Sequence, residues 1–190
     1  MREIVFDLET QKEFAEVGRR NPHLLKISVA GVFDYGTDKF LTFEESELKE
    51  FEKLIRGTSR LIGFNIKAFD IPVLQPYISF DLSKIPMLDI MEEIEKVVGF
   101  RVGLDNIARP TLNEGKSGSG LKALEYWREG RIEELKKYCL DDVRLTRDVY
   151  EYAKANKKLF FLSRDAKIEE IPIELPLIPN KKDENQGALF

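Results

Sequence analysis

Two acidic residues share one face of a short apolar segment near the start of the chain. Residues 3–9 read EIVFDLE, and the alternation of apolar side chains predicts a strand. Side chains at i and i+2 leave a strand on the same side, so Asp7 and Glu9 project together. Carboxylates are rarely buried unless they are paired, hydrogen-bonded or bound to metal. Asp7 alone could belong to an edge strand with one face in water, but Glu9 beside it favours a site.

A third acid lies where a short predicted strand passes into a helix. Asp70 is the last residue of the segment GFNIKAFD, residues 63–70. By itself it is typical of a helix N-cap, because Pro72 then falls in the first helical turn. Its chemical interest depends on the other acids.

The fourth acid lies on a long helix predicted over residues 132–155. Helical spacing places Tyr138 and Asp142 one turn apart on the inward face, while Asp141 falls on the polar face. A buried hydrogen bond between the phenol and the carboxylate would account for this pair without any catalysis.

Together the four acids predict a metal site. Clustered carboxylates repel one another unless cations neutralise them. Mg²⁺ and Mn²⁺ are hard cations that suit ligands made only of carboxylates, and two such ions balance four negative charges. Two ions about 3.5–4 Å apart can activate a water and stabilise the leaving oxygen in phosphodiester cleavage. The pattern therefore indicates nuclease chemistry.

Three segments resemble the motifs of the DEDD superfamily of 3′-to-5′ exonucleases, which are built on the ribonuclease-H-like fold. The matching segments are FDLET (6–10), GFNIKAFD (63–70) and YCLDD (138–142), in the superfamily's order and spacing. The resemblance extends over residues 3–155. It implies that two divalent cations, Mg²⁺ or Mn²⁺, are bound, and that Tyr138 orients the attacking water. The metal ligands that it implies are Asp7, Glu9, Asp70 and Asp142.

The residue one helical turn before the last acid indicates the subclass of the superfamily. The superfamily has either a tyrosine four residues before that acid or a histidine five residues before it. Tyr138 fills the first position and Lys137 the second, and His23 is the only histidine of the chain. The sequence therefore resembles the tyrosine subclass, which includes polymerase proofreading domains. Residues 115–146 are similar to small ribonuclease-H-like domains found alone or near helicases in bacterial proteins.

The resemblance implies an exonuclease that hydrolyses phosphodiester bonds at the 3′ end of single-stranded DNA or RNA. A helicase or another nucleic-acid-processing protein is then a candidate partner. Two alternatives stay open: a binding module on the same fold that has no catalysis, and a ribonuclease-H-type endonuclease that acts on RNA/DNA hybrids. The second would not be expected to need the pairing of Tyr138 with Asp142.

Four residues near the predicted acids are candidate substrate contacts. Asn65, Lys67 and Phe69 belong to the second motif, and Lys116 lies in a Gly/Ser-rich loop over residues 111–120. Each has a plainer interpretation: Asn65 could fix a turn, Phe69 could be core, and single lysines on loops are commonly solvated.

Strands followed by helices must position these residues. We expect an α/β protein of the ribonuclease-H-like fold, with a mixed central sheet whose first strands are antiparallel and later ones parallel, flanked by helices. Asp89, which ends a strand, could be an acid that supports the metal ligands, but a cap of the helix before Met91 is the favoured interpretation. The predicted strands are 3–9, 24–35, 39–43, 60–64 and 85–89, and the predicted helices are 46–57, 69–78, 90–98, 104–108, 120–128 and 132–155.

Length and composition exclude several classes of protein. The chain has 190 residues, of which 34 are acidic and 30 basic, so it is neither a polybasic clamp nor a disordered chain. One cysteine and one histidine exclude a disulfide framework and a Cys/His zinc site, and they favour the reducing cytoplasm. No apolar stretch is long enough to cross a membrane. We predict one domain over residues 1–161 and a charged, proline-containing wrap or tail over 162–190.

Overall fold

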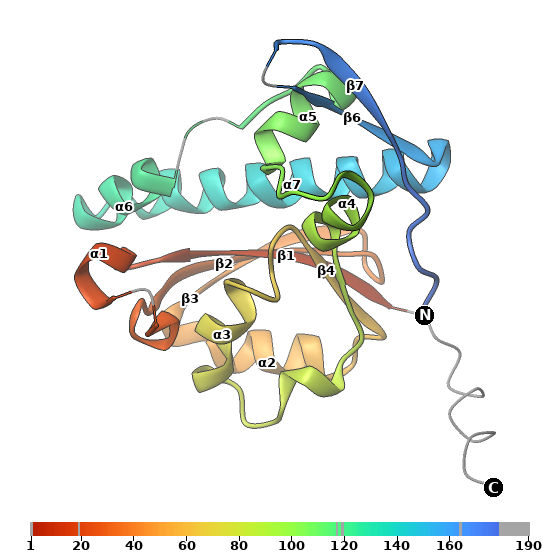
Figure 1. Cartoon of the computed structure of the whole chain (residues 1–190). Coiled ribbons are helices and arrows are strands. Elements are labelled where there is room, and N and C mark those ends of the chain that lie inside the picture. The colour runs from red at the N-terminus through yellow and green to blue at the C-terminus, as the bar shows by residue number, and fades with distance from the viewer. Residues whose placement is uncertain (1, 19, 117, 119, 164, 179–190) are drawn as a thin grey trace, which may run out of the picture.

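A mixed five-stranded β-sheet with helices on both faces forms the centre of the molecule (Figure 1). The computed structural model describes residues 2–18, 20–116, 118, 120–163 and 165–178. The predicted antiparallel-then-parallel order is confirmed: the first three strands are antiparallel neighbours, and the last two run parallel to the first. In spatial order the strands are β3 (Lys39–Glu44), β2 (Ile27–Asp34), β1 (Glu3–Thr10), β4 (Arg60–Gly63) and β5 (Met87–Asp89).

Strand β1 is central, but one of its edges is only partly paired. Along the other edge it pairs with β2, where Asp7 lies opposite Gly31. Strand β4 pairs with β1 only from Glu3 to Val5. The backbone N–H of Leu8 therefore lies beyond the end of β4. A buried N–H needs an acceptor, so this position of β1 calls for a side chain from elsewhere.

Helices cover both faces of the sheet (Figure 1). They differ from the prediction in three places, of which the first is the short helix α1 (Phe14–Val17), which was not expected. The helix expected over residues 69–78 ends at Leu74 and continues as a 3₁₀ turn, and the one expected over 104–108 extends to Leu112. The α-helices of the described residues are α1 (Phe14–Val17), α2 (Leu48–Arg56), α3 (Asp70–Leu74), α4 (Ile90–Val98), α5 (Leu104–Leu112), α6 (Gly120–Arg128) and α7 (Ile132–Asn156). Short 3₁₀ turns occupy Pro22–Leu24, Glu45–Glu47, Gln75–Tyr77 and Leu82–Lys84.

Helix α7 packs closely on the sheet because a glycine lies beneath it. A Cβ atom on Gly31 would lie 2.7 Å from the Cys139 sulfur and 3.1 Å from Cγ2 of Val143. Only a residue without a side chain leaves room for α7 at this distance. The inward face of α7, which carries Tyr138 and Asp142, thereby reaches the middle of β1.

A second, two-stranded sheet follows α7. Strands β6 (Lys158–Leu162) and β7 (Ile168–Pro172) pair antiparallel and pack beside α5. Thr111 of α5 contributes to this packing, since its hydroxyl donates to the Phe160 carbonyl at 3.1 Å and accepts from the Phe160 N–H at 3.0 Å. The domain boundary predicted at residue 161 therefore falls inside β6, and β7 belongs to the segment predicted as a wrap or tail.

The chain beyond β7 also contributes to the core. Ile173 and Leu175 are buried, and the Pro176 carbonyl accepts a hydrogen bond of 2.6 Å from Arg60. Residues 117 and 119 of the predicted loop and residues 164 and 179–190 of the predicted tail lie outside the described residues. No helix among the described ranges is both long and apolar enough to span a membrane.

Candidate metal centre and cleft

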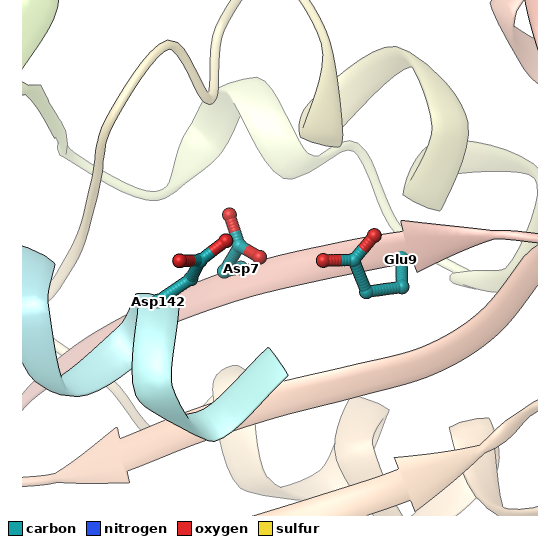
Figure 2. A group of neighbouring side chains, drawn as sticks. All are labelled: Asp7, Glu9 and Asp142. Atoms are coloured by element: carbon teal, nitrogen blue, oxygen red, sulfur yellow. The ribbon is translucent and has the colours of Figure 1, made fainter. Parts of the chain in front are cut away.

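Three of the four predicted acids converge on one point between β1 and α7. Asp7, Glu9 and Asp142 each place a carboxylate oxygen so that these atoms all lie within 4.8 Å of one another. Figure 2 shows the carboxylates of Asp142 and Asp7 close together, with Glu9 further along the strand and turned toward them. This spacing allows one cation to contact all three groups.

The convergence follows from local structure. Asp7 and Glu9 leave the same side of β1, and that side faces α7. On α7 the residue four positions before Asp142 is Tyr138, so both project inward. The Cys139 thiol lies 3.5 Å from the Asp7 carbonyl, to which it donates a weak hydrogen bond.

Asp70 lies beside this cluster and is held separately. It is the first residue of α3 and is 2% exposed. Its Oδ1 accepts a hydrogen bond of 2.9 Å from the Leu8 N–H, the group that β4 leaves unpaired. Asp70 is thus hydrogen-bonded to strand β1 at Leu8, the residue between Asp7 and Glu9.

A cleft of about 310 Å³ opens onto all four acids. The aromatic rings of Phe14 and Phe69 meet in it edge to face, with centroids 5.9 Å apart. The cleft therefore combines an acidic floor with an apolar wall. Its lining residues are Asp7, Leu8, Glu9, Thr10, Lys12, Glu13, Phe14, Leu25, Phe64, Asn65, Phe69, Asp70, Lys116, Gly120, Leu124, Tyr138 and Asp142.

Lys116 supplies a positive charge to the acids. Its Nζ lies 2.7 Å from Oδ2 of Asp142, and its side chain is 27% exposed. It also lies 6.0 Å from the centre of the Tyr138 ring. One ammonium group can balance only one of the four carboxylates, so the other carboxylates repel one another when they are ionised.

Burial and mutual repulsion disfavour ionisation of the acids. Burial, together with the charge of Asp142, raises the pKa of Asp7 to about 7, although Lys116 opposes the shift. Burial and the charge of Asp7 likewise raise the pKa values of Glu9 and Asp70 well above their ordinary range. A bound cation would relieve this cost, since it favours the ionised carboxylates.

The donor set suits a divalent metal ion. Oδ1 of Asp142 is buried and has no hydrogen-bond partner among the described residues. A buried oxygen without a donor is costly, and cation coordination would satisfy it. Three carboxylates within reach of one point are ligands that Mg²⁺ and Mn²⁺ prefer.

The predicted substrate contacts do not all reach the cleft. Asn65, Phe69 and Lys116 line it. Lys67 instead lines a separate surface hollow. Its Nζ pairs with Glu92 at 2.5 Å. The structure therefore brings three of these four residues to the acids.

Lys12 and Phe14 are among the cleft residues that were not predicted from the sequence. Phe14 begins α1, whose N-cap is Glu13, with Glu16 completing a capping box. The usual signature of this motif has Ser or Thr at the cap, so the short helix has a weak sequence signal.

Comparison with known proteins agrees with the architecture. The family model described as the RNase_H superfamily matches residues 4–154. The chain therefore belongs to the RNase_H superfamily, and the predicted ribonuclease-H-like fold class is confirmed. This membership supports nuclease activity in general. No curated protein matches the chain.

A similar solved structure is the family B DNA polymerase from the hyperthermophilic archaeon Pyrobaculum calidifontis. It matches with a TM-score of 0.61 and 19% sequence identity, over 80% of this chain and 24% of the polymerase chain. The likeness is one of fold, and this chain spans about a quarter of the polymerase's length.

Proposed function

We propose that the chain is a metal-dependent 3′-to-5′ exonuclease of the tyrosine subclass, acting on single-stranded DNA or RNA with two Mg²⁺ or Mn²⁺ ions. The observation that carries this proposal is the meeting of Asp7, Glu9 and Asp142 at one point, with an unpartnered Asp142 oxygen, in a cleft walled by Asp70 and Tyr138. The order of the three motifs and the superfamily match support it.

Each acid has a proposed role in holding metal. Asp7, Glu9 and Asp142 would hold one divalent cation, and Asp70 together with Asp7 would hold the second. When bound, such cations lower the pKa of a water and stabilise the leaving oxygen of the phosphodiester.

Tyr138 would orient the attacking water through its hydroxyl. That hydroxyl donates to the Gly118 carbonyl at 3.3 Å. Burial and the neighbouring Asp142 raise the pKa of the phenol, so it keeps its proton at neutral pH. A neutral phenol can position a water but is a poor base.

The remaining cleft residues suit a single strand that enters by its end. The partly buried Phe14 and Phe69 side chains give the cleft aromatic surface on which a base can stack, and Asn65 offers an amide. Lys116 is the candidate phosphate contact nearest the acids. Because the chain carries a net charge of -4, a helicase or another nucleic-acid-processing partner would raise its affinity for substrate.

Digestion of 5′-labelled single-stranded DNA and RNA with Mn²⁺, Mg²⁺ or EDTA tests the proposal. We expect a ladder that shortens from the 3′ end, requires metal and disappears in Asp142→Asn. The matched control is Asp141→Asn, which alters the adjacent acid of α7. Asp141 lines a different surface hollow, outside the cleft, so this variant should leave the ladder intact.

A circular single strand and an RNA/DNA hybrid provide the opposing outcomes. Cutting of the circle or of internal hybrid positions would identify an endonuclease. Binding of the oligonucleotide without any cutting would identify a binding module. Either result would overturn the exonuclease proposal.

A further inference from the structure

Asp89 has no role in the proposed chemistry, yet both oxygens of its buried carboxylate accept hydrogen bonds from the backbone. It ends β5 and is 1% exposed. Its Oδ1 accepts from the N–H groups of Asn65 at 2.8 Å and Met91 at 3.1 Å, and its Oδ2 accepts from the Lys67 N–H at 3.0 Å. The Met91 bond is the helix cap that the sequence predicts. The other two bonds serve a different segment of the chain.

The two additional bonds hold the turn between β4 and α3. Asn65 has a φ of 69°, in the left-handed region that non-glycine residues adopt at a cost. The N–H groups of Asn65 and Lys67 converge on one carboxylate, which makes the turn a small anion-binding concavity. Bonds to an ionised acceptor are stronger than bonds between neutral groups, so Asp89 can maintain this conformation.

The register of the sheet places Asp89 at this turn. Strands β4 and β5 run parallel, with Gly63 opposite Asp89. The carboxylate at the end of β5 therefore lies beside the first residues that follow β4.

The same turn determines where Asp70 lies. The Asn65 carbonyl accepts a hydrogen bond of 3.2 Å from the Phe69 N–H, immediately before Asp70. Asp70 in turn bonds the Leu8 N–H of β1 at 2.9 Å. The turn is thus held by Asp89 at its start and by β1 at its end. The Asn65 side chain, which lines the cleft, is also held by a hydrogen bond from Arg101.

We propose that Asp89 is a positioning residue for the metal centre, because its carboxylate fixes the turn that places Asp70 and Asn65 at the cleft. The inference rests on the proposed metal-dependent activity. If Asp89 served only as the cap of α4, its loss would lower stability without altering metal affinity.

Two variants of the full chain test the proposal. Asp89→Asn preserves the shape but turns one acceptor into an amide N–H₂ donor, and Asp89→Ala removes all three bonds. The matched control is Asp34→Asn. Asp34 is another fully buried carboxylate that ends a strand, and it bonds Arg2 and the Gly36 N–H away from the cleft. Its replacement lowers stability without touching the turn.

The main readout is the dissociation constant for Mn²⁺, measured by calorimetry at a temperature where circular dichroism shows each variant folded. We expect Asp89→Ala to weaken Mn²⁺ binding about 10- to 100-fold, as loss of a group that orients metal ligands typically does. Asp89→Asn should lie between Asp89→Ala and wild type, and Asp34→Asn should match wild type. Amide exchange at Asn65 and Lys67 should accelerate only in the Asp89 variants.

Two results would count against the inference, and they are distinguishable. Folded Asp89 variants with wild-type Mn²⁺ affinity and an unchanged kcat would show that Asp89 is only a cap. If Asp89→Ala does not fold, Asp89→Asn decides by the same two quantities. A wild type that neither binds Mn²⁺ nor cuts nucleic acid would overturn the proposed function itself and this inference with it.

Discussion

The surroundings of Tyr138 decide which role its hydroxyl can take. The side chain is almost fully buried between α7 and the cleft, with 3% exposure. Burial first and the charge of Asp142 second raise the pKa of the phenol. A phenol that keeps its proton can donate one hydrogen bond and accept another, which suits the orientation of a water better than its deprotonation.

Tyr138→Phe should therefore slow the reaction without abolishing it. We expect kcat to fall about 10- to 100-fold, at or below the lower end of what a positioned proton-transfer group contributes. Mn²⁺ affinity and the fold should be retained, because the ring still fills its site and no proposed metal ligand is lost. Single-turnover rates on a 5′-labelled strand measure the effect. A loss of activity as complete as in Asp142→Asn would mean that the Tyr138 hydroxyl does more than orient a water. An unchanged rate would mean that the hydroxyl has no role in the reaction.

At the site, sequence spacing identified the acids but not their contacts. Asp7 and Glu9 follow from strand alternation, and Tyr138 and Asp142 from helical spacing, because both periodicities are local. The bond from Leu8 to Asp70 and the bonds from Asn65 and Lys67 to Asp89 depend on strand register. Register is a property of the folded sheet, so spacing along the chain could not reveal these contacts.

The distance between α7 and the sheet is the element-scale feature on which the cluster depends. Asp142 reaches Asp7 only because α7 lies directly on β2 at Gly31. Gly31 is the cross-strand neighbour of Asp7, so the closest approach of the helix coincides with the acids. Any side chain at this position would press on the turn of α7 that carries Tyr138 and Asp142.

Gly31→Ala should destabilise the protein by about 1–3 kcal/mol, the usual cost of overpacking a tight core. The added Cβ would lie 2.7 Å from the Cys139 sulfur, which must move. Cys139→Ala removes that sulfur, so the double variant should recover part of the loss. Urea unfolding of the wild type, both single variants and the double variant gives the coupling energy. Strictly additive losses would show that the two residues do not oppose each other.

The helices and strands with clear apolar patterns in the sequence were the ones that could be predicted. The 25-residue helix α7 was expected near its observed position because several residues repeat its period. Strands β1 to β5 were expected from alternation or from short apolar runs rich in strand-forming residues. The four-residue α1 has too short a pattern, and its cap is an unusual Glu13. Strand β7 was missed because only Ile171 of its five residues is buried, so its pairing with β6 leaves little alternation to detect.

At the scale of the whole molecule, burial of neighbouring carboxylates in the cleft makes the stability of the fold depend on pH. The ordinary pKa of an aspartate is 3.8, and that of Asp7 in the folded protein is about 7. The folded chain therefore holds this proton more tightly than the unfolded chain. The stability that the protonated Asp7 contributes to the folded state is fully present below its ordinary pKa of 3.8. It is lost as the pH rises through about 7.

A divalent cation should reverse that loss, and the reversal should depend on pH. Metal binds the ionised carboxylates, so below the raised pKa of Asp7 it must displace the proton of this residue, whereas above that pKa Asp7 is already ionised. We expect saturating Mn²⁺ or Mg²⁺ to raise Tm by about 5–10 °C near pH 8, which corresponds to roughly 3 kcal/mol at 100 times the dissociation constant. The rise should be smaller near pH 6.

Thermal unfolding with metal or EDTA at both pH values measures this linkage in wild type, Asp7→Asn and the control Asp141→Asn. Asp7→Asn removes a ligand and the raised pKa together, so its metal-induced rise in Tm should be small at either pH. Asp141→Asn should keep the metal-induced rise, since this acid lies outside the cleft and acts on Asp142 only through its charge. Equal rises in wild type and Asp7→Asn would mean that the metal binds elsewhere. A pH-independent rise in wild type would mean that protons and metal do not compete for the same carboxylates.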